Sequence, residues 1–336
     1  MKKIVLLSLL FFVLGRSSAQ DPHFSQFFSS PLTLNPAFTG KFDGSFRIAG
    51  NYRNQWPTIN NAFTTATASA DFHIMKNSIP SNDTWGMGFM AYNDNSAAGA
   101  VNFNYATIST AYHKGLDEEG NNQIGAGFQL TYANMLINTA NLKFEDQLTT
   151  NGFTGVTNEI FNNSTLKTNY IDINAGVLYN GSTSDRNNFY VGVSLYHITR
   201  PKQQFTGGLY NLNPRATIHA GTYFPLGQEG NLTLHLSGMQ SFQGGAAETV
   251  VGGALQISTG TASDNPASLY VGSWIRLNDA IIPYIGLEYG NFRLGTTYDV
   301  NTSSLKTGSN GQGGIEVSLI YVYRPSTDKP INCPKF

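Results

Sequence analysis

Apolar and polar side chains alternate along much of this chain with a period of two residues. The pattern is clearest near the C-terminus, where Phe292, Leu294 and Thr296 share one face while Arg293 and Gly295 share the other. Successive side chains of a β-strand point to opposite faces, so each such segment predicts a strand with one apolar and one more polar face. Fourteen strands are expected, near residues 44–53, 62–74, 84–92, 101–114, 122–134, 168–180, 188–199, 214–224, 231–241, 248–258, 267–276, 281–289, 291–300 and 314–323.

The connections between these strands fall into two groups. If both termini lie in the periplasm, gaps such as 181–187 and 289–291 face the periplasm, and they carry the Gly, Asn and Asp residues that tolerate turn geometry. Gaps on the other side include the long stretches 135–167 and 301–313, and the gap 75–83 is a longer exception on the periplasmic side. Short periplasmic turns and long external loops are typical of outer-membrane barrels.

Composition favours lipid as the solvent of one face. Charged residues make up 12% of the chain, against about 25% in ordinary soluble domains. Aromatic residues also make up 12%, and the net charge of −1 leaves no basic face for nucleic acid. We therefore expect an all-β fold, a transmembrane antiparallel β-barrel of about 14 strands in the outer membrane.

A secreted β-sandwich is the soluble alternative, because it also alternates faces over many strands. Fourteen strands without a boundary would be large for one sandwich. Strand ends also carry aromatic residues, for example Tyr289, Tyr298, Tyr321 and Tyr323. Tyrosine rings prefer the membrane interface, since one end is apolar and the other polar. The aromatic strand ends therefore favour the barrel over the sandwich.

The two ends of the chain fall outside the barrel pattern. Residues 1–19 combine two lysines, an apolar run and a small-residue site ending at Ala19, the layout of a secretory signal peptide. We assign 20–43 to an irregular N-terminal segment, 44–323 to the barrel and 324–336 to a tail. The tail holds the single cysteine, Cys333, which leaves a free thiol or an intermolecular bond open.

The polar residues give little sign of catalysis. Six histidines show no metal-ligand spacing, so neither a metal nor a cofactor is expected. His219 and His235 fall on neighbouring strands, where they are interpreted as wall residues. Ser237 follows His235 on one strand face, but this pair lacks the third group that would orient an imidazole. We predict that the protein is not an enzyme.

Four charged residues near the C-terminus are expected to point into the barrel. Polar groups inside a barrel need partners, so an ion-pair network in the lumen is the plain interpretation, ahead of a catalytic carboxylate pair. The four residues are Arg276, Arg293, Asp299 and Glu316.

The segment 20–43 is the most distinctive part of the chain. Alternation fails there, and Pro22, Pro31 and Pro36 exclude a central strand. Its irregularly spaced aromatics indicate a segment with something to bury, either as a plug in the lumen or along the periplasmic rim. It either seals the barrel or docks a partner. The candidate docking residues are Phe24, Phe27, Phe28, Phe38 and Trp56.

The same region carries a family resemblance. The runs Asp-Pro-His-Phe-Ser-Gln at 21–26, Leu-Asn-Pro-Ala-Phe-Thr-Gly at 34–40 and Asn-Tyr-Arg-Asn-Gln-Trp-Pro at 51–57 resemble the PorP/SprF family of the type IX secretion system of Bacteroidetes. The strand 315–323 and the closing Cys-Pro-Lys-Phe at 333–336 agree with it. The resemblance implies an outer-membrane barrel that works with the secretion and gliding machinery.

The resemblance also sets the expected function and partners. It implies export or anchoring of cell-surface proteins such as adhesins, with periplasmic components of the secretion system as further partners. No catalytic or cofactor-binding residue comes with it. The alternative functions are an outer-membrane channel or small-solute transporter, and a membrane-embedded hydrolase that would depend on His235.

Overall fold

A computed structural model describes most of the chain between Asp21 and Pro325. The described ranges are 21–59, 62–161, 163–184, 187–205, 208–227, 231–259 and 267–325. The predicted signal peptide 1–19 and Cys333 lie outside these ranges, as does most of the tail. These assignments therefore stay predictions.

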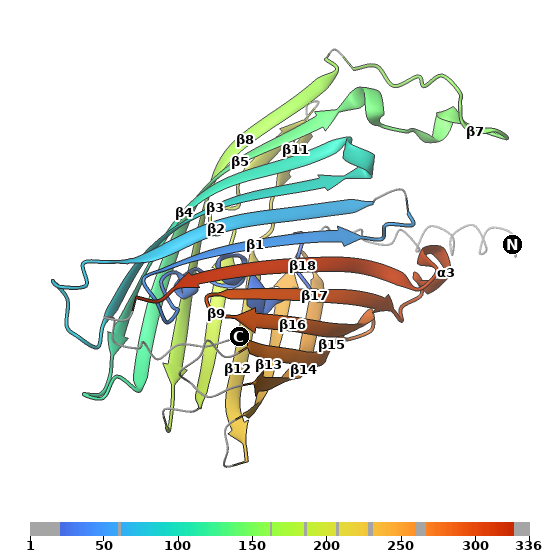
Figure 1. Ribbon diagram of the computed structural model, residues 1–336. Coiled ribbons are helices and arrows are strands. Elements are labelled where there is room, and N and C mark those ends of the chain that lie inside the picture. Colours follow the sequence, from blue (N-terminus) through green and yellow to red (C-terminus); the bar gives the residue numbers. More distant parts are fainter. Residues whose placement is uncertain are drawn as a thin grey trace, which may run out of the picture.

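The chain forms one closed antiparallel barrel of fourteen strands (Figure 1). All fourteen expected strands are present, and closure comes from β1, which pairs with β2 on one side and with β18 on the other. The barrel strands are β1 (Phe46–Gln55), β2 (Phe63–Ile74), β3 (Thr84–Ser96), β4 (Val101–Gly115), β5 (Asn122–Asn138), β8 (Thr165–Gly181), β9 (Asn188–Tyr196), β12 (Arg215–Leu226), β13 (Leu232–Gln243), β14 (Ala246–Thr259), β15 (Ala267–Arg276), β16 (Ala280–Tyr289), β17 (Phe292–Asn301) and β18 (Gln312–Tyr323).

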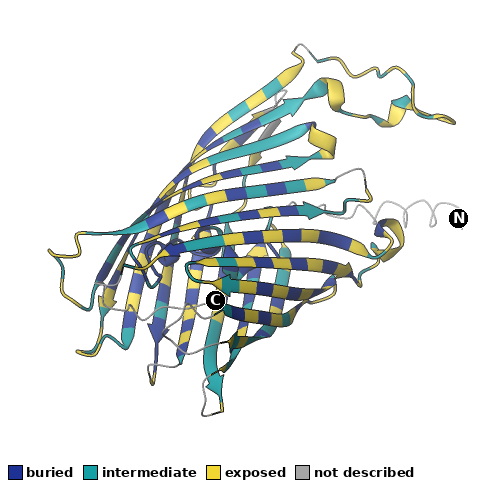
Figure 2. Cartoon of the chain, viewed as in Figure 1, coloured by how far each residue is buried: buried dark blue, intermediate teal, exposed yellow. Residues whose placement is uncertain are grey.

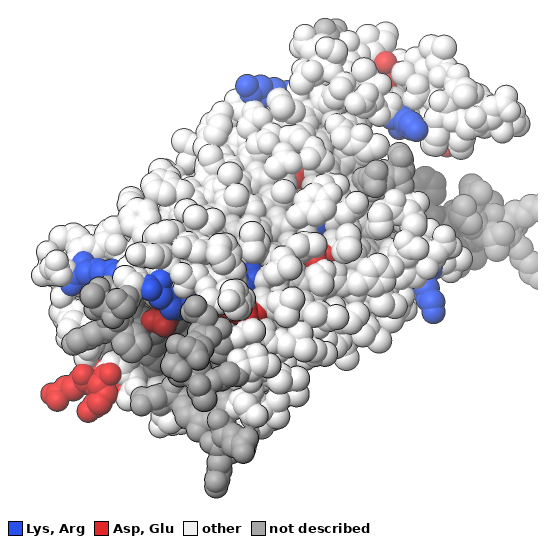
Figure 3. Space-filling view, in the orientation of Figure 1, with Lys and Arg blue, Asp and Glu red and all other residues white. Residues whose placement is uncertain are grey.

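Burial alternates along the strands as the sequence pattern predicts (Figure 2). In β9 every second residue is buried, and the exposed positions between them include Val191 and Val193. Figure 3 shows one face of the barrel, where charged side chains gather toward the two ends and leave the middle of the wall almost uncharged. A wall that exposes aliphatic side chains in the middle and charges at its ends is suited to lipid contact.

The loops add small elements that the sequence pattern did not predict. They are β6 (Leu148–Thr149), β7 (Gly152–Phe153), β10 (Lys202–Phe205), β11 (Gly208–Asn211), η3 (Ala97–Gly99), η4 (Thr139–Asn141), η5 (Glu145–Gln147) and α3 (Lys306–Ser309). No helix in the described ranges is long and apolar enough to cross a membrane.

The barrel wall has an uneven height. The strands β5 and β8 have 17 residues each, whereas β9 has 9. The expected strand 188–199 ends early because His197 adopts a φ of 58°, which breaks the extended backbone. The wall formed by β3, β4, β5 and β8 therefore rises well above β9 at the end that carries the long loops (Figure 1).

The N-terminal residues 21–43 coil inside the barrel, where Figure 1 draws them as short blue turns. They form η1 (Phe27–Ser29), α2 (Pro31–Leu34) and η2 (Pro36–Phe38). Proline occupies the first turn of α2 and η2, where a missing N–H has no cost. We call residues 21–43 the plug.

Candidate functional site: the lumen and its plug

The plug crosses the lumen from one end of the barrel to the other. At the end with the loops 139–164 and 197–214, here the long-loop end, the Asp21 backbone N–H donates to Gln243 Oε1 at 2.7 Å. At the opposite end, with the short turns, the Arg324 guanidinium donates to the Asp43 carbonyl at 3.0 Å. The sequence interpretation placed both termini on the short-turn side. That holds for β1 and β18, but Asp21 lies on the long-loop side.

Asn35 anchors the middle of the plug to the wall. Its Nδ2 lies 3.1 Å from the carbonyl oxygen of Val177 and 3.2 Å from that of Val193. The same nitrogen lies 2.9 Å from His219 Nε2, and Asn35 Oδ1 accepts the Ala37 N–H at 2.8 Å. A fully buried amide with these partners fixes the height of the plug in the barrel.

Glycines make room for this approach. A Cβ added at Gly176 would lie 1.9 Å from Asn35 Oδ1, and one at Gly127 would lie 2.4 Å from the Pro36 carbonyl carbon. Real Cβ atoms do not come so close to other atoms, so only glycine leaves space at these two wall positions. The plug backbone therefore packs directly on the barrel backbone.

A buried charge cluster holds the plug nearer the long-loop end. Arg53 pairs with Asp299 at 2.8 Å and with Glu316 at 3.4 Å, while Arg276 pairs with Asp299 at 3.1 Å. Ser25 joins the plug to this cluster, since its N–H donates to Glu316 at 2.7 Å and its hydroxyl to Asp299 at 2.8 Å. The predicted lumen network of Glu316, Asp299 and Arg276 is confirmed.

Arg293 does not belong to that cluster, contrary to the sequence interpretation. Its guanidinium pairs instead with Glu288 at 2.6 Å, on the neighbouring strand β16. The Tyr270 hydroxyl also donates to Glu288 at 2.8 Å. Arg293 is the second residue of β17, so it lies near the short-turn end, six residues along the strand from Asp299.

A second ion pair near the short-turn end was not predicted. Arg47 pairs with Asp71 at 2.7 Å, and the Arg47 guanidinium also donates to the Phe38 carbonyl at 3.0 Å. Asp71 in turn accepts the Gly40 N–H at 2.8 Å. The pair joins plug to wall, but its two residues are 24 positions apart in sequence, and only the strand register brings them together.

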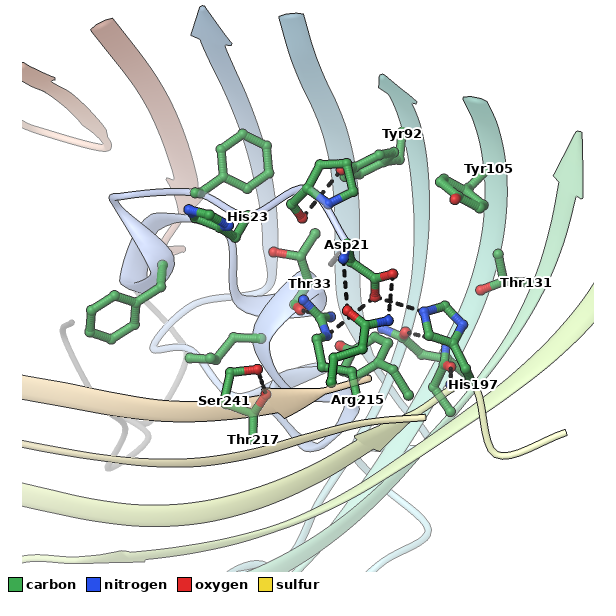
Figure 4. Close-up of a pocket in the computed structure, with 18 of the residues that line it drawn as sticks. Asp21, His23, Thr33, Tyr92, Tyr105, Thr131, His197, Arg215, Thr217 and Ser241 are labelled. Carbon is green, nitrogen blue, oxygen red and sulfur yellow. Dashed lines mark hydrogen bonds and ion pairs between the residues drawn. The ribbon is translucent and has the colours of Figure 1, made fainter. Parts of the chain in front are cut away.

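At the long-loop end, His197 joins the plug to the wall (Figure 4). Its Nε2 lies 2.7 Å from Asp21 and its Nδ1 lies 2.7 Å from Asp172, while Arg215 lies 3.4 Å from Asp21. Burial favours a neutral imidazole, but the charge of Asp21 and the hydrogen bond to Asp172 outweigh it and raise the pKa of His197 to about 9. Burial likewise opposes the Asp21 carboxylate, but His197 and Arg215 hold its pKa below its ordinary range.

The plug has an open space on each side. Toward the long loops lies a cavity of about 100 Å³, bordered by Asp21, Tyr105 and His197 among others. Toward the short turns lies a second cavity of about 100 Å³, bordered by Phe42 and Arg324 among others. The plug therefore separates a vestibule at the long-loop end from one at the short-turn end.

The five candidate docking aromatics do not share one surface. Phe24, Phe27 and Phe38 are buried, with 3%, 3% and 5% of their surface exposed. Phe28 is half-buried with its ring 4.6 Å from that of Trp274, and Trp56 is half-buried at the end of β1. The three buried rings pack the plug in its place. Docking by this set stays a prediction.

The histidines of the wall act as packing and hydrogen-bonding residues. His219 contacts Asn35, whereas the His235 ring lies 2.9 Å from Gln256, so the two do not converge on one site. Ser237 accepts a hydrogen bond from Trp274 at 3.1 Å. Within the described ranges, no three His, Cys, Asp or Glu side chains gather as a metal site would need.

The fold and the filled lumen define a class of protein, a plugged transmembrane β-barrel of the outer membrane. The family described as "Type IX secretion system membrane protein PorP/SprF" matches residues 16–321. The chain belongs to this family, which confirms the resemblance seen in the sequence. The family is one of secretion-system membrane proteins.

Solved outer-membrane barrels have a similar fold. A deletion mutant of TodX, a monoaromatic hydrocarbon channel, has a TM-score of 0.51 at 9% identity, over 91% of this chain and 95% of that one. TodX of Pseudomonas putida, a toluene transporter, has a TM-score of 0.49 at 8% identity, over 90% and 95%. BamA of Haemophilus ducreyi has 0.44 at 12% identity, over 83% and 70%. A search among curated proteins finds no match.

Proposed function

We propose that this protein is a non-enzymatic outer-membrane component of the type IX secretion and gliding machinery, which helps to export or anchor cell-surface proteins such as adhesins. Membership of the PorP/SprF family supports the system. The plugged lumen supports a holding role over free diffusion, because the wide barrel is filled from wall to wall by residues 21–43. The filled lumen is the observation that carries the proposal.

Export is tested by removing the gene and measuring the surface proteins of intact cells by biotin labelling and mass spectrometry. The proposal expects one or more exported surface proteins to be lost from the surface and retained in the periplasm. Re-expression of the wild-type chain should restore them. Unchanged surface proteins in the deletion strain would overturn the proposed function.

The alternative function is a channel or small-solute transporter. The vestibules on both sides of the plug are the observation that favours it. Planar-bilayer recording of the purified barrel separates the two functions. A platform is expected to be silent, whereas removal of residues 21–43 should open a stable pore, since a fourteen-strand barrel is wide enough to conduct. A stable pore in the wild-type chain would favour transport.

The docking residues are tested by alanine substitution. Trp56 is half-buried and lies outside the plug, so alanine there should weaken partner binding while the plug stays in place, whereas alanine at Phe28 also removes ring contacts with Trp274 and Tyr284. Alanine at Phe24, Phe27 or Phe38 removes packing inside the lumen and would act on the plug as well. Normal surface display in all five variants, with the barrel inserted, would argue against a docking role for this set.

A further inference from the structure

The half of β8 nearer the long-loop end has an unpaired strand edge. On one side β8 pairs with β5 along its whole length, from Thr165 to Gly181. On the other side β9 reaches only as far as Ala175, which pairs with Leu195. Beyond that point the described ranges give β8 one further backbone hydrogen bond on this side, from Ile198 N–H to the Ile173 carbonyl at 3.1 Å.

Strand geometry identifies which backbone groups are left unpaired. The N–H and C=O of one residue point to the same side of a strand, and those of the next residue point to the opposite side. Ile173 directs its carbonyl toward the β9 side. The β5–β8 register has no shift, so Thr165, Lys167, Asn169 and Ile171 direct theirs to the same side. Four residues therefore present a row of donors and acceptors at the long-loop end.

Nearby chain does not complete this edge. The hairpin of β10 and β11 stands beside β8, but β10 pairs only with β11. A side-chain hydrogen bond joins it to β8, from Gln203 Nε2 to the Tyr170 hydroxyl at 3.3 Å. The outward side chain of Ile171 is 62% exposed, against 50% for Val177 lower on the same face, where β9 is present. β10 lies close beside this edge without sharing its ladder, so an added strand would take the place of the hairpin.

A ladder of asparagines leads across the outer face to this edge. Asn93, Asn104, Asn134 and Asn169 face one another in register on β3, β4, β5 and β8. Asn93 donates to Asn104 at 2.8 Å and Asn134 donates to Asn169 at 2.6 Å. Asn169 is exposed and ends the row. A polar residue on an added strand would extend the ladder by one rung.

We propose that this edge of β8, from Thr165 to Ile171, receives an extended segment of an exported surface protein as an added β-strand. An unpaired edge is a template for strand addition, in which main-chain hydrogen bonds supply the affinity. The side chains set the pattern of the partner. Lys167 fits an acidic residue opposite it, Asn169 a polar one and Ile171 an aliphatic one, at alternate positions of the added strand.

This inference rests on the proposed function, because it takes the partner from the exported proteins. Its test is a backbone change at one edge residue. Lys167→Pro removes an N–H from the open edge, where proline is tolerated because no ladder bond of the barrel is lost. Lys167→Ala removes the side chain and keeps the N–H. Thr168→Pro, whose N–H faces β5, should instead impair the barrel.

The measured quantity is the amount of each exported protein on intact cells, by surface biotinylation and mass spectrometry. Lys167→Pro should lower at least one of them by about tenfold, since one partner carbonyl loses its hydrogen bond. Lys167→Ala should lower it far less. Heat-modifiable migration on a gel checks that each barrel is folded. Normal export with a folded Lys167→Pro barrel would overturn the inference.

Photo-crosslinking gives a second readout on an intact backbone. A photoreactive residue at Thr165 or Ile171 should form an adduct with the same protein that Lys167→Pro depletes. The matched control is Ile285 on β16, which has paired strands on both sides. No adduct at the β8 positions would overturn the inference, whether or not Lys167→Pro inserts. If the deletion strain loses export while these tests fail, strand addition alone is wrong and the proposed function stands.

Discussion

The Nε2 atom of His197 lies 2.7 Å from Oδ2 of Asp21, and this contact ties the first described residue of the chain to the end of β9. The same ring holds Asp172 on β8 through Nδ1. One imidazole therefore joins the plug to the wall at the point where the wall is lowest. A change in the charge of this ring should therefore change how firmly the plug is held.

The His197 contact predicts that high pH loosens the plug. The pKa of His197 is raised from 6.5 to about 9, so its stabilising contribution is complete below pH 6.5 and is lost as the pH rises through about 9. Because the pKa of Asp21 is lowered, its own contribution is lost only under strongly acidic conditions. Protease cleavage within residues 21–43 should increase above about pH 9.

The control for this pH effect is His197→Gln, which keeps hydrogen-bonding groups but carries no charge. Its plug should be cleaved more readily at neutral pH, with no further rise near the pKa of the lost histidine. A wild-type cleavage profile that stays flat through pH 9 would contradict the assigned role of the imidazolium.

Asp299→Asn should destabilise the barrel. Asp299 is 1% exposed and forms ion pairs with the guanidinium groups of Arg53 and Arg276. Removing one partner of a buried ion pair costs about 3–5 kcal/mol, and we expect the lower end of this range because Arg53 still pairs with Glu316 and Arg276 with Glu248. Urea unfolding in lipid vesicles measures the loss. The surface change Glu118→Gln should leave the unfolding midpoint within error.

Gly127→Val should displace the plug. The added side chain would meet the backbone of Pro36 and Ala37, and the plug is the more easily moved of the two, since the wall is held by strand pairing on both sides. Planar-bilayer recording should then show an open pore. Ala126→Val, one position away on the exposed face of β5, is the matched control and should remain silent. A silent Gly127→Val barrel would argue against this packing.

Phe38→Ala should loosen the plug without opening the wall. The Phe38 ring packs 5.6 Å from that of Tyr190 and 5.3 Å from that of His219. Truncating a buried phenylalanine costs about 3–5 kcal/mol. Here the loss should destabilise the plug in the lumen. Protease access to residues 21–43 measures it. Phe128→Ala, on the outer face of β5, should leave that access unchanged, and equal access in both variants would count against Phe38 as an anchor.

The barrel itself follows from local pattern. Alternation in segments such as 292–301 identified all fourteen strands, since lipid outside and a polar lumen inside impose opposite demands on successive residues. The ends of the strands do not follow from this pattern. His197 has nothing in its sequence neighbourhood to show that its φ is positive, so the expected strand continued past Tyr196.

The lumen contacts required the folded chain. Glu316 and Asp299 could be placed inside from alternation alone, but their partner Arg53 lies 246 positions from Asp299. Arg293 was assigned to the same cluster, because alternation gives the face of a residue and not its height in the barrel. Asn35 could be read as a turn residue, while its contact with His219 depends on the route of the plug.

The sequence by itself determined the class of fold, the number of strands, the lipid-facing side chains and the family, because each depends on residues that are close together in the chain. Tertiary structure alone decided that residues 21–43 cross the lumen, that Asp21 and Asp43 lie at opposite ends, and that β9 stops short of β8. These features depend on strand register and strand height around a closed ring, and closure is a property that no single segment carries.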